Sequence, residues 1–235
     1  MGESGPDSDQ WIPLHGDWVH GPGVTDGYLI TVELILVRHA LPERREVADG
    51  PADPGLSEAG HAQARHLAEY FAQEHLDALY ASPMRRAMET VKPIAETKKM
   101  DWTVVDGVAE WDRDSNEYIP IEELKAANDP RWREIVEGGW TSNEPPEDFA
   151  ERVITSLETI ISDHRGETVL VSCHGGVINA YLSRVLGLDG SQFFYPNYTS
   201  IHRIAASGRG HRSILSINET SHLRGTGLPV GIFRS

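Results

Sequence analysis

Short apolar runs alternate along this chain with stretches in which apolar residues recur every three or four positions. Residues 31–37 are β-branched and residues 167–172 are largely aliphatic, so both predict buried strands, and 77–81 and 102–105 are shorter strand candidates. Helices are predicted at 57–75, 83–97 and 147–164 and in a stretch that ends at Leu186, and late strands at 201–206 and 213–217. This order indicates an α/β fold, a three-layer sandwich in which a mostly parallel sheet has helices on both faces.

Two parts of the chain lack this regularity. Residues 1–30 are rich in glycine, aspartate and proline, which predicts an irregular N-terminal extension, and its expected anchors are Trp11, Ile12, Leu14 and Trp18. Residues 31–235 are then expected to form one domain. Within it, residues 110–145 are irregular apart from short helices expected near 121–126 and 130–136, so this insertion is a candidate lid.

Composition and charge exclude several classes of partner. The formal net charge is −15, from 36 acidic and 21 basic residues, which argues against broad binding to nucleic acid or to an anionic membrane. No apolar run is long enough to span a bilayer, and residues 1–30 lack the basic start and apolar centre of a secretion signal. The single cysteine, Cys173, cannot form an intrachain disulfide, so we expect a cytoplasmic protein.

Two histidines lie where predicted strands end. Arg38 and His39 follow the first strand, and His174 follows a later one and precedes Gly175 and Gly176. In an α/β sheet the ends of the strands present the binding site. Glycines at the start of a helix let an anion approach the free N–H groups, and the planar fork of an arginine matches phosphate oxygens. A lone histidine here is more often structural, but the repeated arrangement favours a shared anion site.

A third segment contributes cations to the same end of the sheet. The strand at 77–81 leads into Ser82 and Pro83, with Pro83 expected in the first turn of the next helix, followed by Arg85 and Arg86. Cations at a helix N-terminus oppose the helix dipole. A solvated basic turn is therefore a less attractive interpretation than an arginine that meets a bound anion.

The motifs LVRHA, PGLSEAGHAQA, YASPMRRAMET and VSCHGGVINAYL, in this order over about residues 31–220, resemble the signatures of the histidine phosphatase superfamily. The resemblance implies a phosphoglycerate-mutase-like fold, no metal or organic cofactor, and a His39 that becomes phosphohistidine. It further implies that Arg38, Arg86 and His174 hold the phosphoryl oxygens. From its place at the start of a helix, we expect Gly175 to lie beside them. Glu110 matches the proton donor of the family, with Asp112 and Glu117 as rivals. Chemically, a neutral His39 is a competent nucleophile, and we expect a protonated His174 to add positive charge.

The chain departs from the family pattern after His39. Pro42 replaces a hydroxyl residue, and Arg45 stands where an asparagine is usual, so we expect Arg45 to reach the phosphate instead. The segment after Glu110 also lacks the pattern of the phosphoglycerate mutases. A phosphatase that hydrolyses a phosphate monoester is therefore the leading hypothesis. A phosphoglycerate-type mutase and a catalytically silent phospho-ligand binding protein remain open.

The expected partner is a small phosphorylated substrate whose identity the sequence does not reveal, and the oligomeric state is equally open. Aromatic residues in the insertion favour a pocket that accepts an apolar or ring-bearing group, namely Trp111, Tyr118, Trp132 and Trp140. The aromatic stretch at 193–200 is a second candidate for the pocket wall, although such clusters are more often part of the core.

Overall fold

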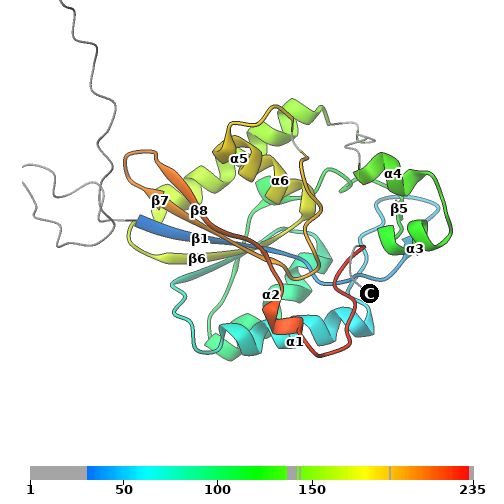
Figure 1. Ribbon diagram of the computed structural model, residues 1–235, viewed down its shortest axis with the longest axis horizontal. Coiled ribbons are helices and arrows are strands. Elements are labelled where there is room, and N and C mark those ends of the chain that lie inside the picture. Colours follow the sequence, from blue (N-terminus) through cyan, green and yellow to red (C-terminus); the bar gives the residue numbers. More distant parts are fainter. Residues whose placement is uncertain (1–30, 137–141, 143, 191, 233–235) are drawn as a thin grey trace, which may run out of the picture.

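The computed structural model describes residues 31–136, 142, 144–190 and 192–232 and has a six-stranded sheet at its centre (Figure 1). The strand order is β4-β3-β6-β1-β7-β8. These strands are β1 (Thr31–Arg38), β3 (Ala78–Ala81), β4 (Thr103–Val104), β6 (Thr168–Cys173), β7 (Ile201–Ser207) and β8 (Arg212–Glu219). The predicted extension and its anchors lie outside the described residues.

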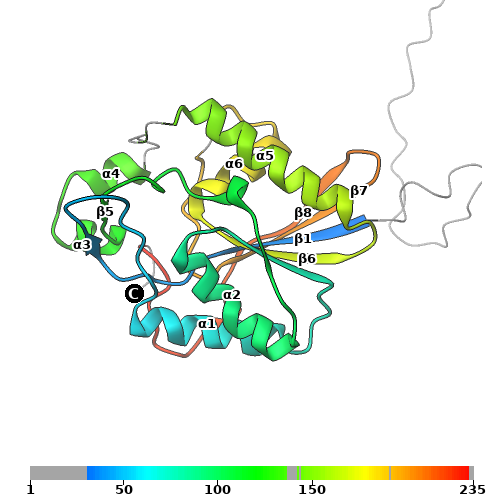
Figure 2. The ribbon, with the colours of Figure 1, turned by 180° about the vertical axis from the view of Figure 1, so that it is seen from behind.

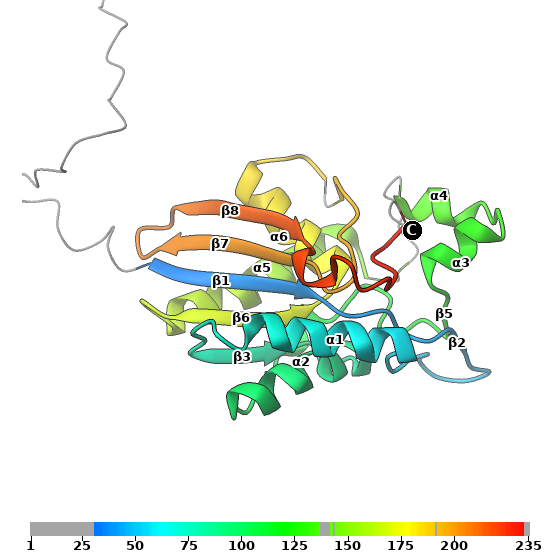
Figure 3. The same cartoon turned by 60° about the horizontal axis from the view of Figure 1, so that its bottom comes forward.

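Four neighbouring strands of the sheet run parallel. β1 pairs with β6, β6 with β3 and β3 with β4, all in parallel, whereas β7 and β8 are added antiparallel at one edge. The prediction of a mostly parallel sheet is confirmed. Figure 3 shows the result, with β1 and β6 side by side near the middle of the sheet. Their carboxyl ends therefore meet at the same edge.

Helices cover both faces of the sheet, as predicted (Figure 2). One face packs against α5 (Pro146–Asp163) and α6 (Gly175–Leu186), and the other against α1 (Glu58–Phe71) and α2 (Arg85–Lys98). Alternate residues of β1 enter the two cores: Leu34 and Leu36 face the α5 and α6 side, while Ile35 and Val37 face the α1 and α2 side. This burial on both faces explains why residues 34–37 of β1 are continuously apolar.

The start of α1 agrees with the prediction and the start of α2 does not. Ser57 caps α1, because its hydroxyl accepts a hydrogen bond from the Gly60 N–H at 3.0 Å. In contrast, α2 begins only at Arg85, after the extended Met84, so Pro83 lies outside the helix. The Asp53 carboxylate accepts the Arg85 N–H and satisfies this terminus from another segment, which local sequence could not reveal.

The insertion after β4 contains more structure than the sequence predicted. After the 3-10 turn η1 (Asp106–Val108), the two-residue strand β5 (Glu117–Tyr118) pairs antiparallel with β2 (Arg45–Glu46). The expected short helices are present as α3 (Ile121–Ala126) and α4 (Arg131–Val136). Figure 3 shows this group beyond the carboxyl end of β1. A last 3-10 turn, η2 (Ser221–Leu223), follows β8 and packs near α1.

Among the described residues, no helix combines the length and the apolar character that crossing a membrane would require.

Candidate active site

The two histidines at the strand ends are brought together by the register of β1 and β6. Arg38 pairs with Cys173 as the last matched pair of the two strands, and the His39 N–H donates to the Cys173 carbonyl at 2.9 Å. The imidazole rings of His39 and His174 have centroids 5.2 Å apart. Both side chains are buried, at 3% and 0% exposure. Two residues far apart in sequence thus form one buried pair.

His39 is held in a single tautomer. Its Nδ1 lies 2.8 Å from the Ala40 carbonyl oxygen, so Nδ1 carries the proton and donates, and Nε2 keeps its lone pair. Burial lowers the pKa of His39 well below its ordinary value, and the positive charges of Arg86 and Arg38 lower it further. The ring is therefore neutral near pH 7, which is the form that can attack phosphorus.

His174 also has one fixed nitrogen. Its Nε2 lies 2.7 Å from the Ser82 hydroxyl, while its Nδ1 is buried with no partner among the described residues. Burial and then the charge of Arg86 lower the pKa of His174 well below its ordinary value. The expectation of a protonated His174 is therefore wrong for the free protein. A neutral ring that accepts from Ser82 at Nε2 still presents one N–H, at Nδ1, to an anion.

Arg38 is held by the aromatic stretch at 193–200. Its guanidinium carbon lies 4.6 Å from the ring centre of Tyr195 and 4.3 Å from that of Tyr198. The guanidinium donates to the Pro196 carbonyl and, at 3.0 Å, to the Tyr195 hydroxyl. Its Nε is buried with no partner among the described residues. These contacts fix the orientation of the Arg38 guanidinium, and its Nε–H remains able to donate to an anion.

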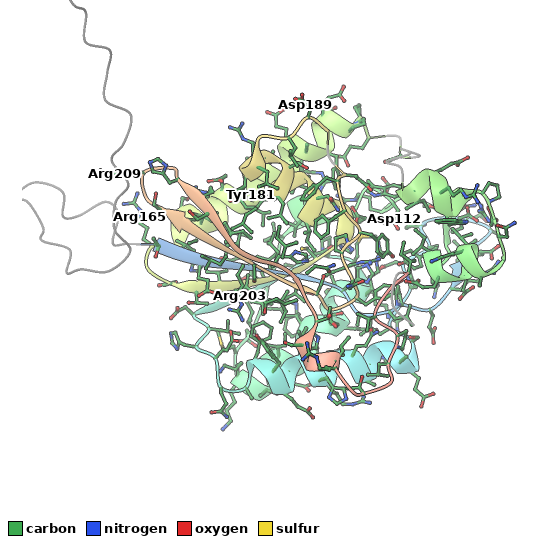
Figure 4. All side chains as sticks on the ribbon, in the orientation of Figure 1. Asp112, Arg165, Tyr181, Asp189, Arg203 and Arg209 are labelled. Atoms are coloured by element: carbon green, nitrogen blue, oxygen red, sulfur yellow. The ribbon has the colours of Figure 1, made fainter. Side chains whose placement is uncertain are left out.

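Arg86 is the most deeply buried cation of the site, with 1% exposure. Its Nη2 donates to Asp112 Oδ1 at 2.7 Å, and its guanidinium carbon lies 4.7 Å from the ring centre of Tyr118. Its Nε and Nη1 are buried without a partner among the described residues. Figure 4 labels Asp112 between the end of the sheet and the helices α3 and α4. A buried donor without an acceptor is costly, so these groups are suited to an anion that supplies the missing oxygens.

Glu110 lies against the start of α6. Its Oε2 accepts the Gly176 N–H at 2.8 Å, and its Oε1 accepts the Trp111 N–H at 3.1 Å. Burial raises the pKa of Glu110 to about 7, and the neighbouring Asp112 carboxylate adds to this rise, although the two N–H groups oppose it. Gly176 is required here, because a Cβ at this position would lie 2.3 Å from Glu110 Oε1. The carboxyl group can thus lose and regain a proton near neutral pH.

The remaining sequence candidates occupy three kinds of position. Gly175 lines the pocket beside His39, as expected, and Asp112 serves Arg86 as an ion-pair partner. Glu117 lies at the exposed rim of the pocket and pairs with Arg131 at 3.1 Å. Arg45 is exposed on β2 and is not among the residues that line the pocket. The structure therefore does not bring Arg45 to the other four cationic and imidazole groups, and its role stays a prediction.

Sequence reasoning missed the residues that hold the site in place. Ser82 was treated only as a strand end, although β3 pairs directly with β6 and so delivers Ser82 to His174. Its position at the end of a strand was the available signal. Tyr195 and Tyr198 lay in the aromatic stretch that was singled out, but their stacking on Arg38 depends on a contact across more than 150 residues.

A pocket of about 270 Å³ at the carboxyl ends of β1 and β6 is lined by Arg38, His39, Arg86, Glu110 and Gly175, whereas His174 lies behind this lining, against the His39 ring. Two of the four aromatic residues proposed from the insertion, Trp111 and Tyr118, line it. Trp132 does not, and Trp140 lies outside the described residues. Phe194 and Tyr195 of the later aromatic stretch also contribute. The described residues contain no group of three or more His, Cys, Asp or Glu side chains that could hold a metal ion.

Comparison with known proteins agrees with this geometry. The sequence is 33% identical over 203 residues to phosphoserine phosphatase 1 of Hydrogenobacter thermophilus, covering 82% of this chain and 94% of that protein. It is 30% identical to phosphoglycerate mutase-like protein 4 of Arabidopsis thaliana, covering 65% of this chain and 70% of that protein. A solved phosphoserine phosphatase of Entamoeba histolytica in complex with phosphoserine superposes with a TM-score of 0.64 at 21% identity. The match covers 82% of this chain and 99% of that one.

Another solved structure, Bacillus stearothermophilus YhfR, has a TM-score of 0.66 at 21% identity, again covering 82% of this chain and 99% of that one. These likenesses support the phosphoglycerate-mutase-like fold. Residues 34–220, which include every buried ionisable group of the pocket described above, match the histidine phosphatase superfamily (branch 1). The chain therefore belongs to the histidine phosphatase superfamily.

Proposed function

We propose that this protein is a phosphatase that hydrolyses a phosphate monoester by passing the phosphoryl group through Nε2 of His39. One observation carries the proposal. Arg38, Arg86 and His174 lie around the His39 imidazole, and each has a buried donor with no partner among the described residues. A phosphoryl group has the charge and the oxygens that would satisfy all of them.

In the first step, Nε2 of His39 attacks phosphorus as the ester P–O bond breaks. Arg38 and Arg86 neutralise charge on the equatorial oxygens, and the His174 Nδ1–H donates to one of them. Glu110 is protonated at and below neutral pH, because burial raises its pKa to about 7, and it gives this proton to the leaving alkoxide. The products of this step are phosphohistidine and a free alcohol.

In the second step, the Glu110 carboxylate takes a proton from water while the water oxygen attacks the phosphohistidine. The P–N bond breaks, inorganic phosphate forms, and His39 and Glu110 return to their starting protonation states. One carboxyl group can serve as acid and then as base because its pKa lies near the working pH. A bound phosphoryl dianion is also an opposite charge next to His174, so it favours protonation of that ring during the reaction.

The printed names of the relatives favour a small phosphorylated substrate. The Hydrogenobacter relative is a phosphoserine phosphatase, and the Entamoeba structure contains phosphoserine. A single cysteine, buried at the end of β6, is compatible with the cytoplasmic location that we propose. Residues 31–235 act in this proposal as one catalytic domain, in which α3 and α4 form a wall of the pocket.

The test is to trap the phosphohistidine. We expect an alkaline quench during turnover of a radiolabelled phosphate monoester to leave label on the wild-type protein and on His75→Ala, whose side chain is 80% exposed. His39→Ala should retain no label and no turnover. Hydrolysis by wild type without any trapped label, or hydrolysis by His39→Ala at the wild-type rate, would show the proposal to be wrong.

A mutase is the alternative to exclude with the same preparation. The protein is incubated with 3-phosphoglycerate and a trace of the bisphosphate, and isomer formation is compared with release of inorganic phosphate. A phosphatase releases phosphate faster than it forms the isomer. The opposite ratio would favour a mutase.

A further inference from the structure

Beyond the phosphate-binding groups, the pocket has a mostly apolar wall. Ile119 precedes α3, Ile121 and Leu124 belong to α3, and Ile135 belongs to α4. Trp111, Phe194, Tyr195 and Pro196 also line the pocket. These residues come from three separate segments of the chain, so the apolar surface is a property of the assembled pocket rather than of one helix.

Two polar side chains that line the pocket, Asn179 and Ser115, are committed to hydrogen bonds within the protein. Asn179 Nδ2 donates to the carbonyls of Gly175 and Phe194, and its Oδ1 accepts the N–H groups of Phe193 and Phe194. The Ser115 hydroxyl donates to the Glu117 carbonyl and accepts from the Glu117 N–H. These two side chains therefore shape the wall and leave little hydrogen-bonding capacity for a substrate.

The charges of the outer pocket are unfavourable for a second anionic group. Among the described lining residues, Arg131 is the only cation besides Arg38 and Arg86. Arg131 is engaged by Asp129 at 2.8 Å and by Glu117 at 3.1 Å. Glu117 and Glu134 add negative charge at the same rim. A carboxylate on the substrate would meet this negative rim and would have to displace an existing ion pair.

We propose, on the basis of the phosphatase function proposed above, that the substrate is a phosphate monoester of an apolar alcohol, alkyl or aromatic, without a carboxylate. The phosphoryl group occupies the inner site at His39, and the organic part lies between α3, α4 and the 193–196 stretch. This preference separates the chain from phosphoserine as a substrate, although the Hydrogenobacter relative is named a phosphoserine phosphatase and the Entamoeba structure contains phosphoserine.

The first experiment measures kcat/KM for ethyl, butyl and hexyl phosphate, whose leaving alcohols have nearly equal reactivity. Each methylene buried in an apolar pocket contributes about 0.8 kcal/mol, so kcat/KM should rise about three- to fourfold per methylene until the pocket is filled. Benzyl phosphate should exceed phosphoserine and 3-phosphoglycerate by roughly tenfold or more on the same basis. A flat alkyl series, or phosphoserine as the better substrate, would overturn the proposal.

The second experiment uses Ile119→Asn and Ile135→Asn, because both side chains are half-buried in the wall and tolerate polar replacement better than a core residue. We expect hexyl phosphate to lose about tenfold in kcat/KM, while phosphoserine changes by less than about twofold. The matched control is Leu215→Asn on β8, where Leu215 is 58% exposed and remote from the lining residues. Equal losses on both substrates would contradict the proposal.

The two proposals fail in different ways. Absence of hydrolysis of every monoester, or absence of a trapped phosphohistidine, would refute the phosphatase function. Normal trapping and turnover with no dependence on the apolar chain would refute only the substrate class.

Discussion

Replacing Glu110 with glutamine should slow hydrolysis of alkyl phosphates far more than hydrolysis of 4-nitrophenyl phosphate. The alkoxide that leaves an alkyl ester needs a proton, and Glu110 is the buried carboxyl group of the pocket whose pKa is raised to about 7. The nitrophenolate leaves without help. General acid catalysis contributes about 10²- to 10⁴-fold, so a loss of that size is expected for the alkyl ester, against less than about tenfold for the aryl ester.

The same substitution should change the pH profile. The proton donor is active below its pKa, so wild-type kcat/KM for an alkyl phosphate should fall as the pH rises through about 7. On the acidic side, the pKa of His39 lies well below its ordinary value, and the limb there should report the second ionisation of the substrate, at about 6. In Glu110→Gln the basic limb should disappear.

Stability gives an independent readout of the raised pKa. The folded protein holds the Glu110 proton more tightly than the unfolded chain, so this group contributes stability below its ordinary pKa of 4.5, and that contribution is lost as the pH rises through about 7. A shift of this size corresponds to at most about 3 kcal/mol. Glu110→Gln cannot ionise and should therefore be more stable than wild type at pH 8 by up to this amount, measured by denaturant unfolding.

The assay compares kcat/KM between pH 5 and 9 for both esters, with Glu147→Gln as the control. Glu147 is an exposed residue in the first turn of α5 and does not line the pocket. Equal losses on the two esters, or a basic limb that persists in Glu110→Gln, would refute this role for Glu110 and move attention to Asp112.

Three other substitutions test how the site is held. Gly60→Ala places a Cβ 2.0 Å from the carbonyl oxygen of Leu41, two residues after the nucleophile, and should destabilise the fold by about 1–3 kcal/mol in denaturant unfolding and reduce activity. Ser82→Ala removes the hydroxyl that sets the His174 tautomer. It should lower kcat by about 10²-fold, and nitrogen NMR of the labelled ring should show mixed tautomers. Asn179→Ala frees the 193–194 backbone, so KM should rise several-fold with kcat little changed, and an unchanged KM would contradict the assigned role.

Much of the fold could be predicted, because its long strands and helices carry a clear periodicity. β1 and β6 were recognised from the aliphatic residues at their centres, 34–37 and 169–171, and α5 from its single apolar stripe. β2 and β5 could not be recognised, because two-residue strands have no period and their pairing depends on where the insertion folds back. The start of α2 was misplaced for a similar reason, since Asp53 supplies its cap from a distant segment.

In the site, too, features set by local sequence could be predicted and features set by distant segments could not. His39 and His174 could be located because strand ends are visible in the sequence, whereas the family resemblance was needed to choose Arg86 over Arg85. The structure brings these three side chains together. The protonation of His174 could not be read from the sequence, because its pKa is governed first by burial and then by a cation from another segment. The exposed position of Arg45 likewise follows from the β2–β5 pairing, which the motif gave no means to see.

The register between β1 and β6 fixes the catalytic groups independently of the apolar wall that contacts the substrate alcohol. Nucleophile and partner imidazole are fixed by backbone pairing in the middle of the sheet, and Glu110 is tied to the first turn of α6. The apolar wall instead depends on α3 and α4, which belong to the insertion after β4 and lie outside the sheet. Transplanting residues 119–136 from a differently selective homologue should therefore alter the choice of alcohol while the reaction itself is inherited intact.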